Sequence, residues 1–135
     1  MKNALAVNLL RQQRDNFRYE FARNWMDQDV DVVIAPAFVG PASAHDTAFY
    51  WTYTSLYNFV DYPGVVFPTP IRTMADEQYD QNYTPLSDAC QHVKQLWEAS
   101  NFDSAPINLQ LVARRHHDNE LFGALSLLRD ILNLP

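Results

Sequence analysis

Residues 31–36 read Asp-Val-Val-Ile-Ala-Pro, a short apolar run rich in β-branched side chains that ends at a proline. Such a run predicts a strand buried on both faces, as in the sheets of α/β proteins. Two further stretches predict strands: residues 64–68, where Val-Val-Phe lies between a glycine and a proline, and residues 106–114, where apolar and polar side chains partly alternate. The chain is therefore expected to contribute three strands to a sheet.

Helical periodicity predicts helices between and around these strands. The first is expected over residues 3–26, where apolar side chains recur at helical spacing and include Phe17, Phe21 and Trp25. The aromatic stretch 47–59 is ambiguous in type, and we interpret it as a helix.

The last two predicted helices have recognisable starts. Thr84 followed by Pro85 is typical of an N-cap and a first helical residue, for a helix that ends near residue 100. Asp118 is expected to cap the final helix, over residues 118–132. The polar residues 73–82 are expected to form an exposed loop. Helices and strands thus alternate along the chain, which predicts the α/β class.

Three strands are few for a sheet that is buried on both faces. We therefore expect them to be a few strands of a larger mixed sheet flanked by helices, completed by additional chain or by a partner. The aromatic side of the first helix also carries more apolar area than three short strands can receive. Self-association through an exposed apolar surface is the expected consequence.

Composition narrows the function classes. The chain has 135 residues, enough for one domain, and its 47% apolar content supports a packed core. Its formal net charge of −6 argues against binding to nucleic acid or to an anionic membrane surface. A single cysteine excludes an internal disulfide and a cysteine-built zinc site, and favours a reducing, cytoplasmic location. The sequence shows neither a signal peptide nor a transmembrane segment.

Three stretches share the order and spacing of one enzyme family. They are residues 31–36 followed by Pro41, Ala42 and His45; residues 53–68, reading Tyr-Thr-Ser-Leu-Tyr-Asn-Phe-Val-Asp-Tyr-Pro-Gly-Val-Val-Phe-Pro; and residues 105–114, reading Ala-Pro-Ile-Asn-Leu-Gln-Leu-Val-Ala-Arg, followed by Asp118 and Glu120. Together they resemble the last part of amidase signature enzymes, in particular acetamidases and fatty-acid amide hydrolases. The resemblance implies that residues 1–135 form the C-terminal portion of an amidase domain.

This resemblance implies hydrolysis of a small-molecule carboxamide by the complete enzyme, with no cofactor, because the family uses a Ser-Ser-Lys triad. The serines of that triad lie in a Gly/Ser-rich segment far before the region matched here, and the lysine lies earlier still. No such segment occurs in the chain, whose only lysines are Lys2 and Lys94. No catalytic residue is therefore assigned, and the chain alone is expected to be inactive.

The resemblance also implies four substrate contacts. Leu56, Thr69 and Ile71 correspond to segments that flank the acyl channel in lipid-amide members of the family. Arg115 lies at a corner that can border the substrate channel. For the surrounding aromatic residues, a place in the core and a place in an apolar pocket both remain open.

Other polar motifs have simpler interpretations. The pair His116-His117 with Glu120 could suggest a metal site, but adjacent histidines rarely point to one centre, so we expect an exposed corner instead. Ser43, His45 and Asp46 could suggest a catalytic set, although such sets form in space rather than in sequence. We expect Asn58 and Asp61 to fix the turn into Pro63, and Cys90 to be a buried, inert thiol.

Two accounts of the chain remain open at this point. The apolar stripe of the first helix reaches back over Met1 without a capping residue before it, which favours a truncated gene product or a mispredicted reading frame. The alternative is a non-catalytic binding protein derived from an amidase.

Overall fold

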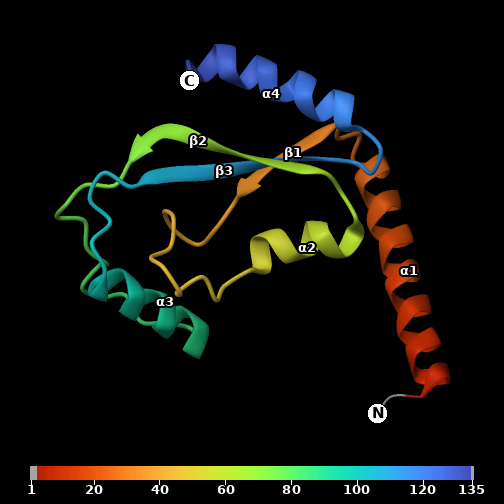
Figure 1. The fold of residues 1–135 in the computed structure, drawn as a ribbon, viewed down its shortest axis with the longest axis horizontal. Coiled ribbons are helices and arrows are strands. Elements are labelled where there is room, and N and C mark those ends of the chain that lie inside the picture. Colours follow the sequence, from red (N-terminus) through yellow and green to blue (C-terminus); the bar gives the residue numbers. More distant parts are fainter. Residues whose placement is uncertain (1–2, 135) are drawn as a thin grey trace.

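The computed structural model describes residues 3–134, which form a three-stranded antiparallel sheet with helices on both faces. The strands are β1 (Val32–Pro36), β2 (Gly64–Arg72) and β3 (Pro106–Ala113), in the order β1-β3-β2. The helices are α1 (Ala4–Asp27), α2 (Thr52–Val60), α3 (Asp88–Ala99) and α4 (Asp118–Leu132). In Figure 1, α4 lies over one face of the sheet, α2 and α3 lie on the opposite side, and α1 stands at one end. The predicted α/β order is confirmed.

The core is centred on β3, the middle strand. Leu111, Val112 and Ala113 are completely buried. Leu111 and Ala113 pack with Phe67 of β2 and Leu121 of α4. Partly buried side chains extend this cluster between the sheet and α4: Val32, Val65, Leu109, Ala124, Leu125, Leu128, Leu132 and Leu134.

The expectation that all three strands are buried on both faces is wrong for β1 and β2. Ile34 remains 50% exposed and Val66 57% exposed, because the strand order places both strands at an edge of the sheet. Double burial occurs only in β3, where both neighbours and both layers of helices are in place.

Strand β2 also runs beyond its predicted end at Pro68 and reaches Arg72. An edge strand tolerates proline where the missing N–H would have faced away from the sheet. The pairing with β3 is irregular between Pro68 and Arg72. There the Thr69 hydroxyl donates to the Ile107 carbonyl at 2.8 Å and accepts from the Ile71 N–H at 3.2 Å. These two bonds stabilise the irregular pairing.

Several helix starts differ from those predicted. Helix α3 begins at Asp88 because Ser87 is its cap in place of Thr84: Ser87 is extended, and its hydroxyl accepts the Cys90 N–H at 3.3 Å. Helix α2 covers only the second half of the predicted stretch. In α4, Asp118 is the first helical residue rather than the cap, and its charge favours the N-terminal end of the helix dipole.

The start of α1 is capped, because the Asn3 side chain accepts the Ala6 N–H at 2.9 Å. The expectation that the helix begins without a capping residue depends on Met1, which lies outside the described residues.

The predicted exposed loop at residues 73–82 begins with a buried residue. Thr73 is only 6% exposed, and its hydroxyl donates to the Phe102 carbonyl and accepts from the Ala105 N–H. Backbone bonds in both directions add to this junction: Thr73 N–H to Ala105 O at 3.1 Å, and Ser104 N–H to Thr73 O at 3.0 Å. Thr73 therefore joins the end of β2 to the start of β3.

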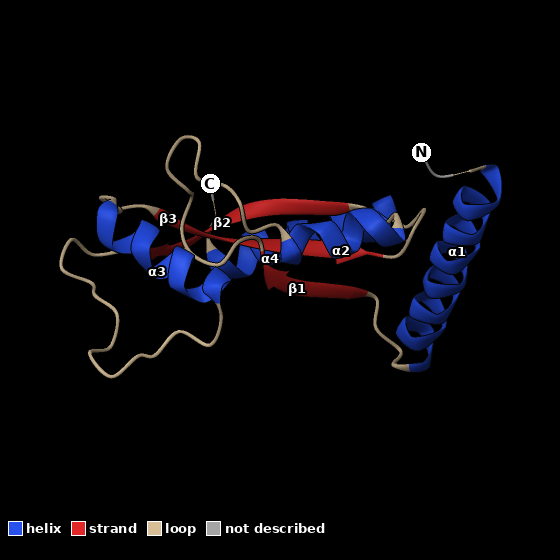
Figure 2. Cartoon of the chain, turned by 90° about the horizontal axis from the view of Figure 1, so that it is seen from below, coloured by secondary structure: helices blue, strands red, loops and turns tan. Residues whose placement is uncertain are grey.

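Helix α1 is attached to the rest of the fold through aromatic rings. Phe17 packs against Phe59, and both Phe21 and Trp25 pack edge-on against Tyr62. Figure 2 shows α1 set apart at one end of the molecule. Its N-terminal half exposes large apolar side chains, namely Leu5, Val7, Leu9 and Leu10. No helix within residues 3–134 is long and apolar enough to cross a bilayer.

The cap assignment predicts the effect of two matched substitutions. Ser87→Ala removes the acceptor for the Cys90 N–H and should lower the free energy of unfolding by about 1 kcal/mol. Thr84→Ala should change it by less than about 0.5 kcal/mol, because Thr84 caps no helix. Urea unfolding followed by far-ultraviolet circular dichroism measures both. A larger loss for Thr84→Ala than for Ser87→Ala would contradict the assignment.

Candidate functional site

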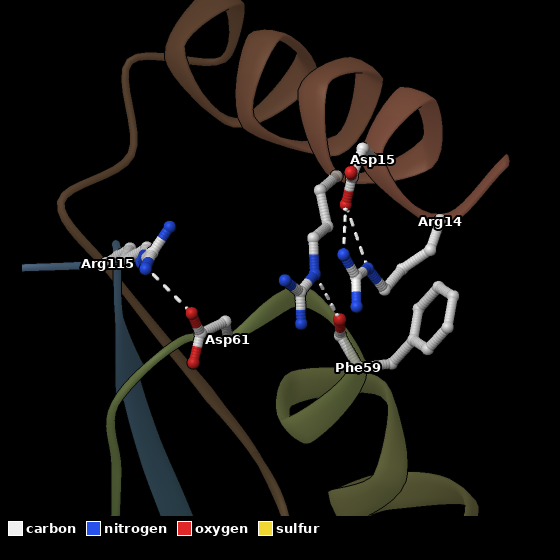
Figure 3. A network of polar contacts seen from close by, with 6 residues as sticks. Arg14, Asp15, Phe59, Asp61 and Arg115 are labelled. Atoms are coloured by element: carbon white, nitrogen blue, oxygen red, sulfur yellow. Dashed lines mark hydrogen bonds and ion pairs between the residues drawn. The ribbon is translucent and has the colours of Figure 1, made fainter. Parts of the chain in front are cut away.

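The best-defined polar site lies where the turn between α2 and β2 meets the corner between β3 and α4. The Arg115 Nε lies 3.0 Å from the Asp61 Oδ2, and this ion pair joins the two segments (Figure 3). Asp61 ends α2 in the left-handed conformation with φ 65°, and His116 adopts φ 67°. Both side chains of the pair are about half exposed, so the pair contributes little to stability and leaves both charged groups accessible.

A hollow of about 350 Å³ opens beside this ion pair. It is lined mainly by polar side chains, which are Tyr57, Asn58, Asp61, Tyr62, Arg115, His116 and Asp118, together with Pro63. Burial raises the pKa of Tyr57 above its ordinary value of 10.0. Burial likewise raises the pKa of Tyr62, and the positive charge of Arg114 partly opposes this. Both phenols therefore keep their protons at neutral pH and can donate hydrogen bonds to a ligand in the hollow.

A second polar contact joins His117, the residue before α4, to Glu120 in the first turn of that helix. The His117 Nδ1 lies 3.1 Å from the Glu120 Oε1. A hydrogen bond from its own backbone N–H, with a smaller contribution from His117, lowers the pKa of Glu120 below its ordinary value of 4.5. His116 instead lines the hollow, so the two adjacent histidines face different surroundings. This arrangement agrees with an exposed polar corner.

The Nε of Arg114 is the one buried side-chain nitrogen or oxygen, within residues 3–134, that has no hydrogen-bond partner. It directly precedes the corner that carries Arg115.

The main polar contact beneath the site is made by Gln110, a buried residue of β3. Its side-chain Nε2 donates to the Pro36 carbonyl and to the Tyr53 carbonyl, both at 2.7 Å. Gln110 is only 4% exposed. One amide thereby fixes the end of β1 and the first turn of α2 to the central strand, and so positions the helix that carries Tyr57.

The four predicted substrate contacts do not converge. Arg115 lines the hollow, but Leu56, Thr69 and Ile71 do not. Pro63 lies at the hollow and Ile71 is eight residues further along β2, so at about 3.3 Å per residue these two positions are roughly 25 Å apart. Leu56 and Ile71 are 37% and 65% exposed, whereas the Thr69 hydroxyl is engaged within the sheet. A ligand that touches both ends must be long.

The turn residues and the thiol differ in part from expectation. Asp61 does end α2 next to Pro63, but its carboxylate binds Arg115 rather than the backbone of the turn. Cys90 is half-buried rather than buried. A hydrogen bond from the Ser87 hydroxyl lowers the pKa of the Cys90 thiol below its ordinary value.

A second, apolar crevice of about 50 Å³ lies between the loop after β1 and helix α3. Ser43 lines it, but His45 and Asp46 do not, so the structure does not assemble these three residues into a catalytic set at this crevice. The other walls are mostly apolar and include Phe38, Pro41, Leu96, Trp97 and Phe102.

Comparison with known proteins identifies relatives for nearly the whole chain. A family model described as Amidase matches residues 2–122. The putative amidase C550.07 of Schizosaccharomyces pombe is 33% identical over 127 residues, which are 94% of this chain and 24% of that protein. An acetamidase of Aspergillus oryzae is 28% identical over 112 residues, which are 76% of this chain and 20% of that protein.

A solved structure gives the same result in three dimensions. A fatty acid amide hydrolase superposes with a TM-score of 0.89 and 26% identity, over 98% of this chain and 24% of that one. The chain thus spans about a quarter of the length of the proteins it matches.

Gln110 provides a first test of the site. Gln110→Met keeps the volume of the side chain but leaves the Pro36 and Tyr53 carbonyls without their donor, and should lower the free energy of unfolding by about 2 kcal/mol. Asn108→Ala, on the same face of β3, is the matched control and should cost less than about 1 kcal/mol. Equal losses in urea unfolding would show that the amide does not join the two elements.

Glu120 provides a second test, through pH. The pKa of Glu120 is lower in the folded chain than in the unfolded chain, so the charged carboxylate stabilises the fold at pH values above the ordinary pKa of 4.5. This contribution is lost as the pH falls through the lower pKa of the folded chain. The stability difference between the unsubstituted chain and Glu120→Gln should therefore shrink between pH about 7 and pH about 3. Glu20→Gln, on α1, is the control. A difference that grows on acidification would contradict the assigned direction.

Proposed function

The chain belongs to the amidase family, and we propose that it forms one segment of a carboxamide hydrolase whose reacting groups lie outside these 135 residues. The observation that carries the proposal is the combination of a close structural match with partial coverage. The match to a fatty acid amide hydrolase covers 98% of this chain but only 24% of that enzyme.

The contacts of the hydroxyl and amine groups support this proposal. A nucleophilic serine needs a neighbouring base and preorganised N–H donors. Within residues 3–134, the hydroxyls of Ser55 and Ser126 donate to backbone carbonyls of their own helices. Lys94 lies 3.7 Å from Glu98 and 6.0 Å from the centres of the Tyr79 and Tyr83 rings. These groups are engaged in local contacts rather than in a catalytic set.

The proposed role of the segment is to scaffold the sheet and to form part of the substrate pocket. Arg115 and the phenols of the hollow offer hydrogen-bond donors to a polar group. Leu56 and Ile71 offer apolar surface to an acyl chain. Thr69 would act through its backbone position, since its hydroxyl is already bonded. Because about 25 Å separates the hollow from Ile71, an amide with a long acyl chain could reach both, whereas acetamide could reach only one.

A second candidate is a non-catalytic binding protein derived from an amidase. It is favoured by the polar hollow beside Arg115, whose phenol and guanidinium groups offer hydrogen-bond donors to a ligand. The two candidates differ in whether the segment supports hydrolysis when the rest of an amidase domain is present.

The first expected result concerns the isolated chain. It should hydrolyse neither acetamide nor a long-chain fatty amide above the buffer rate, and a fluorophosphonate should label none of its serines, because nucleophile, base and oxyanion donors are not assembled. Mass spectrometry and product assays measure both, with the acetamidase of Aspergillus oryzae as the positive control for acetamide. Stoichiometric labelling of any serine would contradict the proposal.

A chimera separates the two candidates. In it, this chain replaces the matching quarter of the Schizosaccharomyces pombe protein. Hydrolysis of an amide by the folded chimera would support the enzyme segment, whereas a folded but inactive chimera would favour the binding protein.

A further inference from the structure

A further polar hollow, of about 430 Å³, lies between the loop after β2 and helix α3, and we refer to it as the α3 hollow. Its walls come from residues between Ala75 and Gln81 and from the second half of α3. Helix α3 is at the opposite end of the molecule from α1 (Figures 1 and 2). The α3 hollow shares no lining residue with the hollow beside Arg115, so it is a separate feature of the surface.

Two aromatic rings in the wall of the α3 hollow are held in fixed orientations. Tyr79 and Trp97 both line it, and their rings stand nearly perpendicular with centres 6.5 Å apart. The Trp97 indole N–H donates to the Glu77 carbonyl at 3.2 Å, which holds the loop against α3. Trp97 also stacks on Phe102, with the ring centres 5.0 Å apart. Because contacts with two other segments already orient Trp97, a ligand that binds its ring does not have to order it.

Negative charge is in excess around these rings. Glu77, Asp80 and Glu98 line the α3 hollow, together with a single cationic side chain, that of Lys94. Glu77 and Asp80 form no ion pair within residues 3–134. Burial raises the pKa of Tyr79 above its ordinary value of 10.0, and the negative charges of Cys90 and Glu98 add to this increase. The Tyr79 ring is therefore that of a neutral phenol in negatively charged surroundings.

One cation of the chain already lies against this aromatic wall. The Lys94 Nζ is 6.0 Å from the centres of the Tyr79 and Tyr83 rings and 3.7 Å from the Glu98 Oε1. A cation over the face of an aromatic ring is attracted by the negative face of its π-system. Because the lysine side chain is flexible, its ammonium group can leave the ring when another cation takes its place.

We propose that the α3 hollow binds a small alkylammonium ion, and that this ion displaces the Lys94 ammonium group from the Tyr79 ring. The rings of Tyr79 and Trp97 select an alkylated ammonium over an inorganic cation, because its alkyl groups are apolar and gain by leaving water. The carboxylates of Glu77 and Glu98 select a cation over a neutral molecule of the same shape. This binding goes beyond the proposed function, since it requires neither amide hydrolysis nor additional chain.

The first experiment compares two probes of the same shape. Choline and 3,3-dimethylbutan-1-ol differ in that a positively charged nitrogen in the first is a carbon in the second. At constant ionic strength, choline should bind the 135-residue chain with a Kd of about 1 mM or lower and shift the indole N–H resonance of Trp97 in a two-dimensional NMR titration. The alcohol should bind at least about tenfold more weakly. Equal affinities for the two probes, no binding of choline, or the same shifts on addition of sodium chloride would overturn the proposal.

Substitutions in the wall then test the role of each group. Lys94→Met removes the internal competitor and should strengthen choline binding by at least about threefold, whereas Glu98→Gln removes an attracting charge and should weaken it by at least about threefold. Trp97→Leu should weaken binding by at least about fivefold. Trp51→Leu, at an exposed tryptophan outside the α3 hollow, is the matched control and should leave it unchanged.

Far-ultraviolet circular dichroism of each free variant checks that it folds. If Trp97→Leu does not fold, the opposite effects expected for Lys94→Met and Glu98→Gln decide the question, because a general loss of structure would weaken binding in both. Weaker binding by Lys94→Met, unchanged binding by Glu98→Gln, or equal losses for the two tryptophan variants would overturn the proposal.

Discussion

The burial of β3 on both faces and along both edges is the constraint on which the other elements depend. Its last three residues are completely enclosed, so their backbone groups need partners on each side and their side chains need apolar cover above and below. Strands β1 and β2 pair with the backbone groups along its two edges, and α4 covers one face. On the other face, Gln110 bonds to a strand end and to α2. The polar corner at Arg115 follows directly from the end of this strand.

The sequence predicts the elements of this fold better than their limits. Hydrophobic runs located all three strands, because apolar side chains must be removed from water wherever the strands pair. The limits depend on contacts made in space: Pro68 does not end β2, since the strand lies at an edge, and Ser87 displaces Thr84 as a cap because of backbone conformation. Thr73 was assigned to an exposed loop because polarity alone does not reveal its partners in the segment before β3.

Only part of the candidate site could be predicted from the sequence. Arg115 was identified through a family resemblance, but its ion pair with Asp61 joins segments 54 residues apart and has no local signal. Gln110 did carry a signal, as an amide within an apolar strand, which usually requires buried hydrogen-bond partners. The separation of Thr69 and Ile71 from the hollow follows from the length of β2, which depends in turn on its place in the sheet.

The attachment of α1 through aromatic rings has a spectroscopic consequence. The three tryptophans lie in distinct surroundings. Trp25 is buried where α1 meets Tyr62, Trp51 is largely exposed, and Trp97 of α3 stacks on Phe102 with the ring centres 5.0 Å apart. Detachment of α1 would move only Trp25 into water and shift its fluorescence emission to longer wavelength. The chain thus contains a natural optical reporter for its first helix, separate from the reporter at α3.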